Sequence, residues 1–106
     1  FVATQGLQTM ARLTFISRMT VKAGREEEFV RVCKALTEKV LAHEAPIFYE
    51  FIKLREPRRY AVLESFRSEA DEHAHMATAW LAEYAPTIID CVDGTWEREY
   101  LDPFEA

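Results

Sequence analysis

Apolar and polar residues alternate along the first patterned stretch of the chain, residues 11–22. A period of two is typical of a β-strand with one buried face. That face would carry Leu13, Phe15, Ser17, Met19 and Val21. After an Ala-Gly turn, residues 25–43 repeat apolar positions at helical spacing, and acidic residues fill the first turn, as the helix dipole favours. The pattern predicts a strand followed by a helix.

Two further strands are indicated at residues 47–54 and 60–66, which are rich in aromatic and β-branched residues. The segment REPRR between them is polar and short, so the pair predicts a β-hairpin.

The second half of the chain begins with a helix-capping signal. Ser68 is followed three residues later by Asp71, which predicts a capping box and a helix over 69–77. Thr78 would cap a further helical piece reaching to about Cys91, and residues 95–101 form a last strand. The order β-α-β-β-α-β predicts an α+β, ferredoxin-like antiparallel sheet with its helices on one face.

The hairpin strands carry apolar residues on both faces, which a sheet with one wet face should not do. Tyr49 and Phe51 point one way, whereas Phe48 and Ile52 point the other. At about 25 cal/mol per Å², leaving about 600 Å² of apolar sheet in water forgoes about 15 kcal/mol of gross burial energy. We therefore predict a homodimer through the open sheet face, because no spare segment is long enough to act as a covering loop in a monomer.

Composition fits a single small domain of 106 residues, with 49% hydrophobic residues. We expect the domain at 10–106, after a leader at 1–9 that is either upstream sequence or was added for expression.

The net charge of −5 without a basic stripe argues against nucleic acid as a partner, and the apolar runs are too short to span a membrane. Cys33 and Cys91 lack a paired spacing, so we predict buried, reduced thiols in a cytoplasmic protein.

Glu64 and His75 are the candidate catalytic residues. If Glu64 faces the helices, its carboxylate lies in an apolar cleft, where burial raises the pKa and an imidazole could share the proton. Such a pair suits proton abstraction from an acidic phenol or carbon acid, although a purely structural pair is the alternative. His73 lies about 200° from His75 around a helix, so the two cannot bind one ion, and we predict no metal site.

Aromatic residues supply either the core or the walls of a ligand pocket. The candidates are Phe15, Tyr49, Tyr60, Phe66, Trp80 and Tyr84. Trp80 and Tyr84 are four residues apart on one helix face, so we expect them to act together. A pocket with such walls favours a flat, polycyclic or quinone-like ligand. The glycine motifs of nicotinamide, flavin and nucleotide sites are missing from the sequence, and we predict no cofactor.

Three stretches together resemble the antibiotic biosynthesis monooxygenase family over about residues 11–101: SRMTVKAGREEEFVRVCKAL, FYEF and RRYAVLESFRSEADEHAHMAT. The resemblance implies a dimeric α+β barrel, with two sheets face to face. It also implies a small oxygenase that acts on anthrones, quinols and related phenols with O₂, often without a cofactor. In that chemistry Glu64 or His75 would be the base. The predicted substrate-binding residues are Phe15, Ser17, Tyr49, Phe66, Trp80 and Tyr84.

The chain departs from the family pattern at several positions. Phe66 stands where Trp is frequent, and Trp80 stands in the place of a Ser-Pro-His segment. A heme-degrading branch uses an Asn, a Trp and a His, and the corresponding positions here are Ser17, Phe66 and Ala85. The heme-ligating chemistry is therefore lost, and we do not expect heme.

Two other functions fit the same fold. One is an isomerase of a small phosphorylated or keto metabolite, which needs arginines in the cleft; Arg18, Arg58 and Arg59 are the candidates. The other is a non-catalytic dimeric binding or stress protein, which a pocket too small or too apolar for a phenol would favour.

Overall fold

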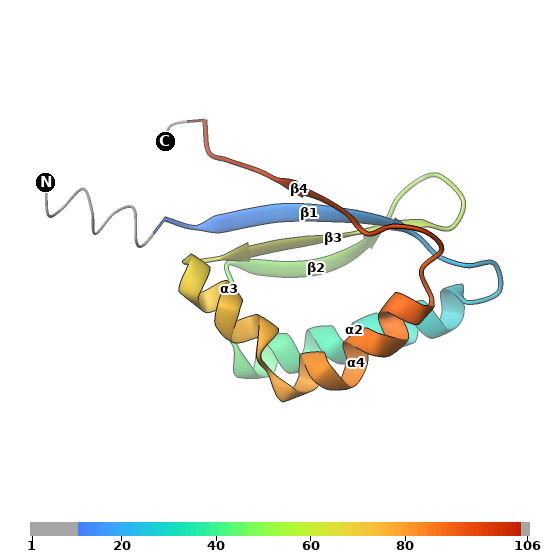
Figure 1. Ribbon diagram of the computed structural model, residues 1–106, viewed down its shortest axis with the longest axis horizontal. Helices are drawn as coiled ribbons and strands as arrows, with labels where there is room; N and C mark the ends of the chain where they lie inside the picture. Colours follow the sequence, from blue (N-terminus) through green and yellow to red (C-terminus); the bar gives the residue numbers. More distant parts are fainter. Residues whose placement is uncertain (1–10, 105–106) are drawn as a thin grey trace, which may run out of the picture.

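The structure, a computed structural model, describes residues 11–104 as one antiparallel sheet with helices packed against it (Figure 1). The strand order is β2-β3-β1-β4. The strands are β1 (Leu13–Thr20), β2 (Phe48–Lys53), β3 (Arg59–Phe66) and β4 (Glu97–Tyr100). The helices are α2 (Glu26–His43), α3 (Glu69–Met76) and α4 (Ala79–Asp90). The predicted ferredoxin-like α+β fold is confirmed, whereas the predicted leader at 1–9 lies outside the described residues.

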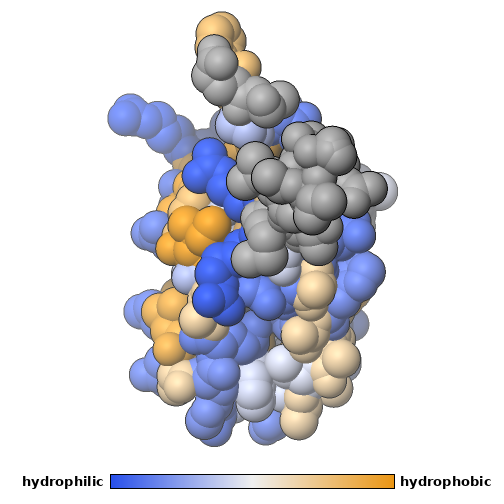
Figure 2. Space-filling view, turned by 90° about the vertical axis from the view of Figure 1, so that its left-hand side faces the viewer, coloured by the Kyte–Doolittle hydropathy of each residue, from blue (hydrophilic) through white to orange (hydrophobic). Residues whose placement is uncertain are grey.

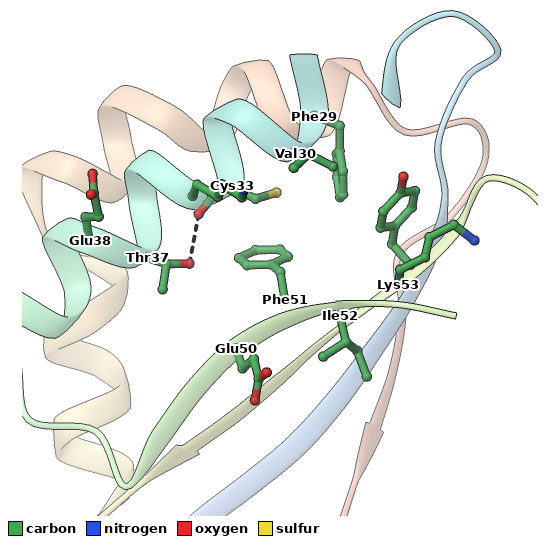
Figure 3. Close-up of a pocket in the computed structure, with 11 residues that line it drawn as sticks. Phe29, Val30, Cys33, Thr37, Glu38, Glu50, Phe51, Ile52 and Lys53 are labelled. Carbon is green, nitrogen blue, oxygen red and sulfur yellow. Dashed lines mark hydrogen bonds between the residues drawn. The ribbon is translucent and has the colours of Figure 1, made fainter. Parts of the chain in front are cut away.

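Alternation along the strands decides which side chains reach the helices. In β2, Phe51 points toward α2, whereas Ile52 turns to the opposite side of the sheet (Figure 3). Phe51 is paired in register with Val62 of β3, and Val62 with Ser17 of β1. Both Val62 and Ser17 are fully buried. The helix-facing side of the sheet is therefore the core side.

Helix α2 closes the core with the stripe that its sequence predicts: its buried residues are Phe29, Cys33, Leu36 and Val40. The end of α4 is tied to the end of β1, since the amide of Lys22 donates to the carbonyl of Cys91 over 2.8 Å. Cys33 and Cys91 are both buried and free, as predicted.

Side-chain caps fix the start of both helices in the second half of the chain. The Ser68 hydroxyl accepts a hydrogen bond from the amide of Asp71, at 3.2 Å, and begins α3. The Thr78 hydroxyl accepts from the amide of Leu81, at 3.3 Å, and begins α4. Because α3 follows β3 after only two residues, this cap sets the position of His75 relative to the sheet.

The opposite face of the sheet carries an apolar strip that the helices do not reach, since they lie on the other side (Figure 1). Ile16, Ile52 and Leu63 are half-buried there, and Phe48 is 38% exposed. On the β4 side the strip ends at ion pairs, of which Arg18 with Glu99, at 2.8 Å, is one. We call these four apolar residues the open-face strip.

The surface at the end of the molecule where β1 begins mixes hydrophobic patches with many hydrophilic groups (Figure 2). Within residues 11–104, none of the helices combines the length and the apolar character that crossing a membrane requires.

Replacing the cap of α3 tests how far this local signal stabilises the fold. We expect Ser68→Ala to lower the free energy of unfolding by about 1 kcal/mol, because the amide of Asp71 loses its acceptor. Urea denaturation at fixed protein concentration measures the loss. Thr95→Ala, at an exposed position, is the control and should unfold like the parent. Equal stability of the two variants would contradict the capping role.

Candidate active site

A cavity of about 460 Å³ lies between the helix-facing side of the sheet and the helices. Most of its lining is apolar, from α2, α4 and the segment before β4. Its polar lining residues are Tyr49, Glu64, His75 and Arg98. The cavity therefore joins a hydrophobic space to a small group of titratable side chains, which is the usual composition of a ligand site.

Glu64 lies in the middle of the sheet and faces this cavity. It is paired with Phe15 of β1 on one side and with Tyr49 of β2 on the other. Glu64 is buried, and this burial raises the pKa of its carboxyl from the ordinary 4.5 to about 7. Arg98 opposes the increase, whereas the negative charges of Glu72 and Glu44 add to it. A carboxyl group with such a pKa can both take and release a proton near neutral pH.

His75 reaches the same place from α3, and the sequence-predicted pair is brought together. Its Nε2 lies 3.8 Å from Oε1 of Glu64, within ion-pair range but longer than a hydrogen bond. The imidazole is buried between the rings of Tyr49 and Phe66, with centroid distances of 5.2 and 5.1 Å. These two rings fix the plane of His75.

Glu44, which the sequence reasoning missed, anchors the other side of His75. Its Oε1 and Oε2 lie 2.9 and 3.1 Å from Nδ1 of His75. The indole N–H of Trp80 donates to Oε2 of Glu44 over 2.7 Å. Glu44 is the residue that ends α2, in a His-Glu-Ala-Pro sequence that reads as a polar helix stop. No local signal in the sequence indicates its pairing with a residue 31 positions away.

A second hollow, of about 550 Å³, lies on the Glu44 side of His75. Its lining includes Glu44, Trp80 and the charged residues Arg67 and Asp71. His75 lines both this outer hollow and the Glu64 cavity, so it stands between the two.

Arg98 is the second residue that the sequence reasoning missed. Its guanidinium lies 4.0 Å from the centroid of the Phe15 ring, a cation–π arrangement that fixes it beside the cavity. The available signal was alternation: Arg98 pairs with Ser17, and Ser17 faces the core. A cation at this place can stabilise an anion that forms beside Glu64.

The predicted substrate-binding residues are dispersed by the fold. Tyr49 lines the Glu64 cavity. Phe15, Ser17 and Phe66 are buried in the core, and the Ser17 hydroxyl has no hydrogen-bond partner within the described residues. Trp80 and Tyr84 both pack against the hydrophobic core, one of the two roles expected for the pair, but they do not wall one pocket together. Trp80 lines the outer hollow with Glu44, and Tyr84, half-buried, lines neither space.

The arginines proposed for a phosphate site lie elsewhere. Arg18 pairs with Glu99, Arg59 pairs with Glu97, and Arg58 donates to the carbonyl of Val21. None of the three lines the Glu64 cavity. Across residues 11–104, the His, Cys, Asp and Glu side chains form no group of three that could hold a metal ion.

A further groove of about 450 Å³ runs between α2 and the edge strand β2 (Figure 3). Phe51 projects into it, and the Cys33 thiol lies above the ring. Burial raises the pKa of Cys33, so the thiol stays protonated and is a poor nucleophile. The Glu64 cavity, with its paired acid and base groups, is therefore the candidate active site.

Comparisons with known proteins identify the family and the fold. The family model for antibiotic biosynthesis monooxygenases matches residues 12–86, which is most of the chain. The chain belongs to this family. No curated protein matched the sequence.

Solved structures with the same fold span nearly the whole domain. A conserved protein from Methanosarcina mazei is 26% identical, with a TM-score of 0.79, and the match covers 91% of this chain and 96% of that one. A Caulobacter crescentus protein, assigned by name to the antibiotic biosynthesis monooxygenases, is 24% identical, with a TM-score of 0.85, covering 97% of this chain and 99% of that one. A Bacteroides thetaiotaomicron protein assigned in the same way is 23% identical, with a TM-score of 0.81, covering 89% and 90%. These likenesses show the fold.

Burial of Glu64 makes stability depend on pH in a defined direction. The folded state keeps a proton that the unfolded chain loses, so the free energy of unfolding falls by about 3 kcal/mol as pH rises from 4.5 to about 7. We expect Glu64→Gln to lack this fall, because glutamine does not titrate. Urea denaturation across this pH range measures it, with Glu38→Gln, at an exposed position of α2, as the control. Identical pH dependence in the parent and in Glu64→Gln would contradict the buried carboxyl.

Proposed function

We propose that this chain is a monooxygenase that oxidises a phenolic, quinol or anthrone-type aromatic compound with O₂, without a cofactor of its own. The observation that carries the proposal is the buried Glu64, whose pKa of about 7 suits a general base, facing a largely apolar cavity of about 460 Å³. Membership of the antibiotic biosynthesis monooxygenase family supports the reaction class.

The cavity suits a flat aromatic substrate. Leu36, Leu81, Ile88 and Trp96 supply apolar lining, and Glu64 and Arg98 lie among them. A ring system bound there places an acidic C–H or O–H group near Glu64, and the negative charge formed on deprotonation near Arg98. Exclusion of water by the apolar lining strengthens both interactions.

The reaction begins when Glu64 takes a proton from the substrate. The resulting electron-rich anion passes an electron to O₂, and the two radicals combine to a peroxide. The O–O bond then breaks as the ring carbon forms C=O, so a CH₂ group and O₂ give C=O and H₂O. Both hydrogens of the carbon leave as protons and end on the departing oxygen. The substrate anion is itself the reductant of O₂, so the electrons balance.

Oxygen consumption tests this function. With a panel of anthrones and quinols, we expect the parent to consume O₂, and Glu64→Gln to lower kcat by about 100-fold or more. Because Glu64 must be deprotonated, kcat/KM of the parent should rise with pH and level off above about 7. An oxygen electrode measures the rates.

Glu38→Gln is the matched control for this experiment, because Glu38 is an exposed glutamate of α2 that does not line the cavity. No O₂ uptake across the panel, or full activity in Glu64→Gln, would exclude the proposed reaction. Conversion of sugar phosphates by the same preparation would favour the isomerase instead.

We further propose that two copies of the chain pair through the open-face strip to form the dimeric α+β barrel. The support is the apolar strip itself, with ion pairs such as Arg59–Glu97 at its edge, which suits a hydrophobic interface core with a polar rim.

A lysine in the middle of this strip tests the pairing. Leu63 is half-buried on the open face, so Leu63→Lys should give a monomer, because two buried ammonium groups would meet across the two-fold axis. Leu41, 58% exposed on α2, is the control position, and Leu41→Lys should stay dimeric. Light scattering after size exclusion gives the mass. A monomeric parent would refute the pairing.

A further inference from the structure

Three side chains from different parts of the chain form a line from the cavity to the outer hollow. Glu64 of β3 faces the cavity, and His75 of α3 follows at 3.8 Å. Glu44, at the end of α2, comes next at 2.9 Å and lines the outer hollow. The acidic residue that contacts His75 most closely is thus not the one that faces the substrate space.

The contacts determine where His75 carries its proton. Nδ1 lies 2.9 and 3.1 Å from the two oxygens of Glu44, and an ionised carboxylate can only accept hydrogen bonds. The neutral imidazole therefore has its hydrogen on Nδ1 and presents the lone pair of Nε2 to Glu64. Trp80 donates to Glu44 as well, which holds the carboxylate in line.

The chemistry of the proposed reaction gives this line a task. A carbon that passes from CH₂ to C=O loses two protons, whereas Glu64 can hold one. The first proton must leave Glu64 before the second is removed. The cavity lining is mostly apolar, and His75 is the polar neighbour that connects Glu64 to the outer hollow.

We propose that Glu44 is a positioning residue of a proton relay, Glu64–His75–Glu44, which holds the first substrate proton while Glu64 removes the second. The relay rests on the proposed oxygenase function and adds to it a role for a residue outside the cavity.

Each transfer conserves protons. The first proton passes from Glu64 to Nε2 of His75 once the 3.8 Å between them shortens to hydrogen-bond distance, while the hydrogen on Nδ1 passes to the Glu44 carboxylate. When the O–O bond breaks, the departing oxygen takes the second proton from Glu64. The first then returns by the reverse transfers, which restores the hydrogen on Nδ1 and completes the water molecule.

Removal of the Glu44 carboxylate tests the relay. Glu44→Gln keeps a hydrogen-bond acceptor for Nδ1 but cannot take a proton, so we expect an unchanged KM and a kcat about 100-fold lower. The solvent deuterium isotope effect on kcat should increase, because proton transfer becomes slower than the other steps. In Glu44→Ala, formate can occupy the vacated place in the outer hollow and should restore kcat. Glu38→Gln is the matched control and keeps the parent's values.

The outcomes separate the relay from the function on which it rests. The relay alone is overturned if the parent is active, Glu64→Gln loses the activity and Glu44→Gln keeps it in full. Loss in Glu44→Gln with an unchanged isotope effect, and no rescue of Glu44→Ala by formate, would also overturn it, since a structural role explains that result. A parent that oxidises no compound of the panel overturns the proposed function and the relay together.

In the parent, ¹⁵N NMR should place the hydrogen of neutral His75 on Nδ1, and a hydrogen on Nε2 would overturn the relay without reference to activity.

Discussion

A carboxyl group shielded from water keeps its proton up to a higher pH, and Glu64 is shielded in this way because of strand register. Its strand is one of the two inner strands of the sheet, so Phe15 and Tyr49 flank it on both sides and exclude solvent. Arg98, on an edge strand, reduces the free-energy cost of ionising Glu64. The apolar cavity, the nearby imidazole and the proposed chemistry all depend on this one desolvated group.

Most of the fold could be predicted from the sequence because its signals are local. Alternation in residues 11–22 indicates β1, and the Ser68–Asp71 cap indicates the start of α3. The residues at which the strands and helices begin and end were predicted less well. The last strand was expected over 95–101, but β4 covers only Glu97–Tyr100, and all its residues are exposed. An edge strand with four solvent-exposed residues has no hydrophobic pattern that would fix its limits.

Part of the site was predicted from the sequence. The predicted residues have a local signal, whereas the missed ones depend on contacts between distant segments. Glu64 stands out as an acid on a buried strand face, and His75 as an imidazole on the helix that follows. Glu44 takes its place through a contact between distant segments, which no local pattern encodes, and the side that Arg98 faces depends on its register with Ser17 of β1. Helical spacing relates Trp80 to Tyr84, and both pack against the core, but the hydrogen bond from Trp80 to Glu44 places its indole beside the outer hollow.

The position of His75 between two spaces of different polarity has a consequence for the ring itself. One edge meets aliphatic surroundings beside Glu64, and the other meets Glu44 beside the charged side chains of Arg67 and Asp71. The two nitrogens of the ring thus have different partners: Nε2 is near Glu64, and Nδ1 is near both oxygens of Glu44. A flip of the ring would take Nδ1 away from the Glu44 carboxylate, so these contacts, together with the packing of Tyr49 and Phe66, select a single orientation.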